Sequence, residues 1–195
     1  MPHWLTLADY KHGYTVHVLE GIEAALKRVQ EDYEDWPDPD FTNEPANHLV
    51  GLAFVAIQNY LTEVPLIVRE SQSDPAVRVR PMNDLLHDFG SHVPGTTLRD
   101  MEAIWHFANY WKHCDEWDRD WVKEAASKPN SSGRTIDILR RLGFSEATNH
   151  LMLEGIERVV QIEWWTSLTP LLARASEWRV QALSGCGCTV RQADA

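Results

Sequence analysis

The chain contains one run, His48-Leu-Val-Gly-Leu-Ala-Phe-Val-Ala-Ile57, that is apolar on almost every side. A helix with one apolar stripe lies at a protein surface, whereas a helix that is apolar all round is buried. The pattern predicts a helix from about residue 42–45 to residue 64, with Pro45 in its first turn and Pro65 kinking or ending it. We therefore expect this helix at the centre of the fold.

Outside this run, apolar residues recur at steps of three and four, which is the spacing of amphipathic helices. Residues 71–81 and 128–133 are instead rich in turn-forming residues and predict loops. A helix capped by Thr96 or Thr97 is expected to reach about residue 122. The further helices that the periodicity predicts are short or of medium length and cover residues 15–34, 82–89 and 136–142.

The last helix is predicted to be the longest, running from a cap at Ser145 to residue 183 and kinked near Pro170. Residues 184–195 are predicted to be a flexible tail. No βαβ alternation and no hairpin pattern is present, so the sequence predicts an all-α fold. We expect residues 1–183 to form a single-domain bundle of four to five main helices.

The composition is that of an ordinary globular domain. Of 195 residues, 44% are hydrophobic and nine are tryptophan, which excludes collagen-like and intrinsically disordered chains. The longest apolar run, residues 49–57, is far shorter than the roughly 20 residues of a membrane span. The first residues lack a signal-peptide pattern, and three cysteines do not suit a disulfide framework. The expected location is the cytoplasm, with no membrane partner.

Acidic residues exceed basic ones by 29 to 18, giving a formal charge of -11. This excess counts against a general nucleic-acid binder. Seven of the carboxylates lie between residues 31 and 44, where there is no Lys or Arg. Such a block is typical of a solvated connection between helices. The alternative is a docking patch for a basic protein partner.

The segment from Leu98 to Trp117 carries a narrow polar line on an otherwise apolar helix. At 3.6 residues per turn, its polar side chains fall on one face. This pattern indicates specific polar groups beside a groove or facing a partner chain. The simpler interpretation is the wet face of a helix, with an i,i+4 pair between Glu102 and His106. The line consists of Arg99, Glu102, His106, Asn109, His113 and Glu116.

The same spacing argues against a metal centre. His106 and His113 are two turns apart, roughly 10 Å along the helix, which is too far for both to bind one ion. Glu102 and His106 would need a further ligand from another helix, from His17, His48 or His150. The sequence therefore predicts neither a metal nor another cofactor, and a metal-dependent helical hydrolase is the third hypothesis. Cys186 and Cys188 are interpreted as a loose thiol pair in the tail.

Metal-free phosphodiester cleavage needs a cation that holds phosphate and an imidazole that moves a proton. Arg99 and His106 offer this pair, because a guanidinium binds phosphate bidentately and an imidazole exchanges a proton near neutral pH. Arg99 also lies near a helix N-terminus, where backbone donors favour anions. Arg134, Arg140 and Arg141 form a small basic island that we interpret as a solvated helix end.

The segment Arg99-Asp100-Met-Glu-Ala-Ile-Trp-His106 resembles the motif of the HEPN family, in which Arg, often followed by a polar residue, precedes His on one helix. HEPN proteins are all-α, and many are toxin or defence ribonucleases. The resemblance implies a homodimer in which two motifs meet. It also implies that Arg99 holds phosphate, Asp100 takes the polar position and His106 is the general base or acid.

The leading hypothesis is therefore a HEPN-like, metal-independent endoribonuclease acting on RNA through Arg99 and His106. The supporting polar residues would be Asp100, Glu102, Asn109, His113 and Glu116. The alternative is a non-enzymatic helical module that binds a protein through the acidic patch or a dimer face. The first hypothesis predicts that Arg99 and His106 lie side by side and partly open to solvent.

Overall fold

The computed structural model describes residues 10–35, 39–163 and 165–188, and the all-α prediction is confirmed for them. Apart from a single bridge between His92 and Arg99, these residues form helices, turns and loops. The elements in chain order are α1 (Tyr10–Asp35), α2 (Pro39–Leu61), α3 (Val64–Ser71), α4 (Pro75–Arg78), α5 (Met82–Asp88), α6 (Asp100–His113), the 3₁₀ turn η1 (Cys114–Glu116), α7 (Trp121–Ser127), α8 (Ser132–Arg141), α9 (Leu151–Val160) and α10 (Thr169–Gly185).

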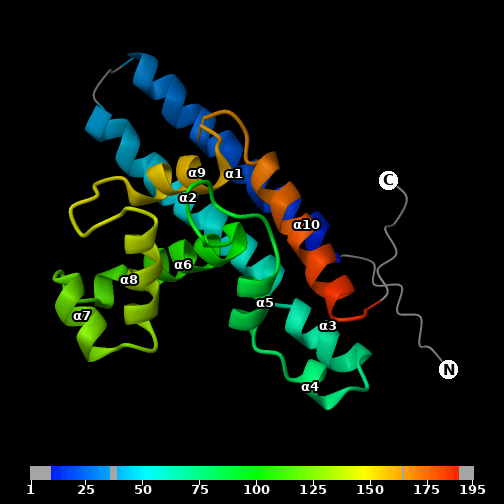
Figure 1. Ribbon diagram of the computed structural model, residues 1–195. Helices are drawn as coiled ribbons and strands as arrows, with labels where there is room; N and C mark the ends of the chain where they lie inside the picture. Colours follow the sequence, from blue (N-terminus) through cyan, green and yellow to red (C-terminus); the bar gives the residue numbers. More distant parts are fainter. Residues whose placement is uncertain (1–9, 36–38, 164, 189–195) are drawn as a thin grey trace.

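Three helices, α1, α2 and α10, run side by side along the molecule, and α6 crosses α2 beneath them (Figure 1). Most apolar side chains of α2 enter the core, and Val50, Ala53, Phe54 and Ile57 are fully buried, whereas Leu52 is 42% exposed. Helix α2 contacts α1, α6, α9 and α10, so it is the central helix together with α6.

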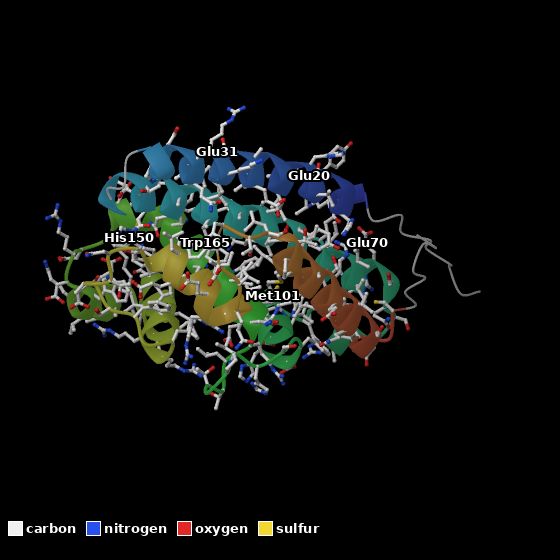
Figure 2. The ribbon with its side chains drawn as sticks, turned by 90° about the horizontal axis from the view of Figure 1, so that it is seen from above. Glu20, Glu31, Glu70, Met101, His150 and Trp165 are labelled. Carbon is white, nitrogen blue, oxygen red and sulfur yellow. The ribbon has the colours of Figure 1, made fainter. Side chains whose placement is uncertain are left out.

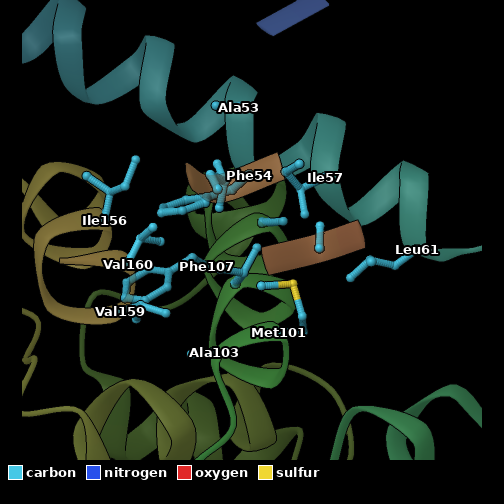
Figure 3. Packing of buried hydrophobic residues seen from close by; sticks show 14 of the residues in the cluster. Ala53, Phe54, Ile57, Leu61, Met101, Ala103, Phe107, Ile156, Val159 and Val160 are labelled. Carbon is cyan, nitrogen blue, oxygen red and sulfur yellow. The ribbon is translucent and has the colours of Figure 1, made fainter. Parts of the chain in front are cut away.

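Side chains from α2, α6 and α9 meet in the core (Figure 3). The rings of Phe54 and Phe107 stack with centroids 5.3 Å apart. Glycines allow the helices to approach closely at two points. A Cβ at Gly155 would lie 2.6 Å from the Phe107 ring, and a Cβ at Gly51 would collide with the Trp111 ring. The contact between α2, α6 and α9 therefore depends on these two missing side chains.

The single long, kinked C-terminal helix is not confirmed, because α9 and α10 are separate helices. Gln161 ends α9 in the left-handed conformation, with φ 61°. Pro170 lies in the first turn of α10, where its fixed φ and missing N–H start a helix instead of bending one. The predicted number of main helices, four to five, is not confirmed either.

The predicted helix to residue 122 is also divided. It begins at Asp100, ends at His113, and is followed by η1 and α7. Asp120 caps α7, because its Oδ1 accepts hydrogen bonds from the backbone N–H groups of Val122 and Lys123. Its side chain thus supplies the start signal of a new helix. In the same way Asp74 caps the short α4 inside the predicted loop over residues 71–81.

The predicted tail begins too early. Helix α10 continues to Gly185, and Cys186 is buried against the core. Residues 189–195 lie outside the described residues, as do residues 36–38 of the acidic segment. Within that segment Glu31 and Glu44 are exposed. Figure 2 places Glu20 and Glu31 of α1 on the side of the ribbon away from Met101 of α6.

One helical stretch, Thr42–Ser71, is long and apolar enough to cross a membrane by length and composition alone. Of its most apolar window, 56% is buried inside the fold. The core helix of a soluble protein passes the same test, so the stretch is weak evidence for a membrane span.

Candidate active site

Arg99 and the adjacent Asp100 hold the start of α6 in place. Asp100 is buried, and its Oδ1 accepts hydrogen bonds from the N–H groups of Ser91 (3.2 Å) and Met101 (2.8 Å). Burial raises the pKa of Asp100 in spite of these bonds. Arg99 donates from Nε to the His87 carbonyl (3.3 Å) and from Nη1 to the Gly90 carbonyl (2.9 Å). Both side chains therefore fasten the preceding loop to α6.

His106 lies inside the protein, so the prediction of an imidazole partly open to solvent is wrong. The residue is 3% exposed, and its Nδ1 is 2.9 Å from the hydroxyl of Thr135 on α8. Nε2 is buried without a hydrogen-bond partner. Burial, and secondly the charge of Arg134, lower the pKa of His106 to about 4. The ring is therefore neutral at pH 7 and joins α6 to α8.

The remaining polar residues of the line face different neighbours. Asn109 accepts a hydrogen bond from Nε2 of Gln58 on α2 at 2.8 Å. Gln58 in turn accepts one from Nζ of Lys112 at 2.7 Å. His113 and Glu116 form an exposed pair, with Nδ1 and Oε1 3.5 Å apart. The residues of the predicted line thus contact several different helices around α6 and do not line one groove.

Glu102 is the member of the line that lies in the wall of a cavity. The cavity has a volume of about 440 Å³ and lies between α5, α6 and α8. Glu102 is 3% exposed, and its Oε2 has no hydrogen-bond partner. Nδ1 of His87 is 3.8 Å from Oε2, and Nη2 of Arg134 is 3.9 Å from Oε1. The wall of the cavity thus contains a buried carboxylate that lies between an imidazole and a guanidinium and has one oxygen without a hydrogen-bond partner.

Local helix patterns place these groups around the cavity. Helix α5 buries Leu85 and Leu86 and leaves His87 exposed. Helix α8 buries its apolar residues in the core and lines the cavity with Arg134, Asp137 and Arg141, which are three, four and seven residues apart and so share one face.

Arginines and carboxylates line the cavity together. Arg80 forms a close ion pair with Asp88. Arg141 lies 3.8 Å from Asp137 and donates to the Thr97 hydroxyl. In all, three arginines and four carboxylates line the cavity. The local charge is therefore close to balanced in a chain whose formal charge is -11.

A second cavity of about 470 Å³ lies beside Phe144 and Arg158. Glu157 lines it, and burial together with the charges of Glu163 and Glu154 raises the pKa of that carboxyl. The residues that line this cavity include no buried polar side chain with an open hydrogen-bonding atom. We therefore place the candidate site at Glu102.

The proposed metal ligands do not converge. His17 lies 3.1 Å from Glu20, and the ring of His48 packs against Trp111. Among the described residues, no group of three His, Cys, Asp or Glu side chains is placed to hold a metal ion.

Sequence reasoning missed the role of His87 and Arg134. His87 stands in a predicted helix with no motif around it, and Arg134 was interpreted as part of a solvated basic island. The one available signal was Glu102, a carboxylate among apolar neighbours whose burial requires partners from elsewhere.

The chain matches no protein-family model, and no curated protein and no solved structure is significantly similar to it. The resemblance to the HEPN family therefore stays a prediction.

Proposed function

We propose that the cavity beside Glu102 cleaves RNA phosphodiester bonds without a metal, with His87 as the proton carrier. The observation that carries this proposal is the position of the Glu102 carboxylate. Its Oε2 is buried, has no hydrogen-bond partner and lies 3.8 Å from His87 Nδ1. The carboxylate thus lies beside the ring that would carry the proton, at ion-pair distance and without a hydrogen bond. The side chain of His87 is 67% exposed, so its ring is accessible from solvent.

The arginines supply the second requirement of the reaction. Arg134 lines the cavity with a side chain that is 42% exposed, and its nearest carboxylate, Glu102, is 3.9 Å away. A distance of this length is an ion pair without a hydrogen bond, so the guanidinium keeps donors for a ligand. A guanidinium matches two phosphate oxygens and stabilises charge that develops on them. Arg141, on the same face of α8, is a second phosphate donor in this proposal.

The reaction would proceed by transfer of the ribose 2′-hydroxyl proton to His87. The 2′ oxygen then attacks phosphorus, and the bond from phosphorus to the 5′ oxygen breaks. The leaving oxygen takes a proton from water, and the resulting hydroxide removes the proton from His87. The products are a 2′,3′-cyclic phosphate and a 5′-hydroxyl, and the imidazole returns to its starting state.

This proposal keeps the predicted chemistry and moves it to other residues. Arg99 and His106 act as positioning residues, because Arg99 holds the loop next to His87 and His106 holds α8 against α6. The homodimer, the cytoplasmic location and a toxin or defence role stay predictions.

The test is cleavage of a single-stranded RNA by the purified full chain in excess chelator. We expect His87→Gln to lower the rate at least about 100-fold, because general acid–base catalysis contributes roughly 10²–10⁴. Glu102→Gln should lower it less, since the imidazole remains but loses its carboxylate.

The matched control is His17→Gln, which removes an exposed histidine from another histidine–carboxylate pair. This variant should cleave like the wild type. The proposal is overturned if the wild type does not cleave in chelator, or if His87→Gln and His17→Gln cleave equally fast.

A further inference from the structure

The end of α10 carries two thiols on one tight turn. The N–H of Gly187 bonds to the Ser184 carbonyl and the N–H of Cys188 to the Leu183 carbonyl, both at 2.9 Å. Gly187 has φ 74°, a conformation that glycine adopts at no steric cost. Residues two apart on such a reversal have Cα atoms within roughly 7 Å, which is the upper limit for a disulfide. The turn therefore brings Cys186 and Cys188 close together in space.

The two thiols differ in exposure, and this difference determines which of them an oxidant in solution reaches first. Cys186 is 5% exposed, whereas Cys188 is half-buried, with its Sγ 3.6 Å from Nε2 of Gln72. An oxidant therefore reaches Cys188 first. The third thiol, Cys114, is on η1, and burial together with Asp115 raises its pKa. A raised pKa lowers the fraction of reactive thiolate at Cys114.

We propose that Cys186 and Cys188 form a reversible disulfide that regulates the cavity beside Glu102, the regulatory part resting on the proposed function. The oxidant is a small-molecule disulfide such as oxidised glutathione. Cys188 loses its proton and attacks one glutathione sulfur, forming a mixed disulfide and releasing one reduced glutathione. Cys186 then attacks the Cys188 sulfur, closes the protein disulfide and releases the second reduced glutathione. Both protein thiols are oxidised and one oxidised glutathione is reduced.

Arg80 connects this turn with the cavity. It lines the cavity, pairs with Asp88 and donates from Nη1 to Sγ of Cys186 at 3.8 Å. Its guanidinium also lies over the Phe89 ring, 5.6 Å from the centroid. Gly185 permits that ring to lie against α10, because a Cβ there would collide with it. Disulfide closure turns the Cys186 sulfur toward Cys188, so Arg80 loses one of its contacts.

The chemical test is incubation of the full chain in glutathione buffers of rising oxidised fraction, followed by thiol counting and peptide mapping. We expect a Cys186–Cys188 disulfide with Cys114 still reduced. Cys186→Ser should stop at a mixed disulfide with glutathione on Cys188, and Cys188→Ser should form no adduct. Cys114→Ser is the matched control and should oxidise like the wild type. The same adduct on every thiol, or no paired disulfide, overturns the proposal.

The regulatory test measures RNA cleavage by the oxidised and reduced protein. Loss of one hydrogen bond changes a binding constant about 3- to 10-fold, and we expect a change of that size on oxidation. Both serine variants at the turn should be insensitive to the buffer. Pairing without any effect on a measurable cleavage rate overturns the regulatory part. Pairing in a protein that never cleaves RNA overturns the proposed function and leaves the thiol site standing.

Discussion

The polar residues of α6 show that burial, more than sequence spacing, determines what a side chain can do. Asp100, Glu102 and His106 are all at most 3% exposed, yet each meets a different neighbour. Asp100 accepts a hydrogen bond from the Ser91 N–H of the preceding loop, and His106 bonds to Thr135. Glu102 lines the cavity between α5, α6 and α8. Chemistry that the sequence assigned to the whole line is therefore concentrated at one of its members.

The buried His106 predicts how stability depends on pH. Its pKa is about 4 in the folded protein and 6.5 as the ordinary value, so the unfolded chain binds more protons between these limits. The contribution of His106 to the free energy of unfolding is therefore fully present above about pH 6.5 and is lost as the pH drops toward 4. The loss from this residue should be about 3 kcal/mol.

Urea unfolding at pH 7 and at pH 4.5 measures this effect. In His106→Gln the drop between the two values should be smaller than in the wild type by most of that amount. The exposed His17→Gln serves as the control and should drop like the wild type. An equal drop in all three proteins would show that the buried imidazole does not determine acid sensitivity.

At the scale of the elements, glycines differ in what surrounds them. Gly51 of α2 lies against the Trp111 ring, where an added Cβ would collide, whereas nothing lies within 4 Å of a Cβ added at Gly21 of α1. Alanine is better than glycine inside a helix by roughly 0.5–1 kcal/mol, so the surroundings decide the sign of the substitution.

We expect Gly51→Ala to destabilise the protein by about 1–3 kcal/mol, because the methyl group forces α2 away from α6. Gly21→Ala should instead stabilise it by roughly 0.5 kcal/mol. Thermal unfolding followed by circular dichroism compares the two. Equal shifts in Tm would show that the Trp111 ring moves aside without cost.

The helices themselves were largely predictable, and their breaks were not. Apolar spacing predicted α1 and α2, since both bury the apolar residues of their inner faces. The division of α9 from α10 depends on a single left-handed residue, Gln161, whose side chain carries no turn signal. Pro170 fits a kink as well as a helix start. His87 and Arg134 reach Glu102 only through packing of α5 and α8 against α6, which one-dimensional spacing does not contain.

At the scale of the whole molecule, the buried apolar residues form one continuous cluster. It takes side chains from every main helix, with Leu19 of α1, Phe107 of α6 and Trp178 of α10 in the same group. Arg179 of α10 reaches across it, with Nη1 3.4 Å from Oε2 of Glu63 and its guanidinium 5.0 Å from the centre of the Tyr60 ring. Helices distant in sequence are thus held in one core.

A continuous core predicts a single cooperative unfolding transition. Tryptophan fluorescence, which reports on several segments including α6, α7 and α10, and far-ultraviolet circular dichroism, which reports on all helices, should give coincident urea curves. Two separated transitions would show that the chain contains two folding units. Gly51→Ala offers an internal check, since it should move both curves together.

The composition of α2 has a consequence for how the chain emerges from the ribosome. Of the helices that cover it, only α1 is synthesised before it, whereas α6, α9 and α10 all come later. For much of translation the apolar surface of α2 is therefore exposed, and exposed apolar surfaces bind chaperones and neighbouring nascent chains. A truncated product that ends before α6 should aggregate unless a chaperone binds it, because the central helix α2 then lacks the helices that cover its apolar side chains.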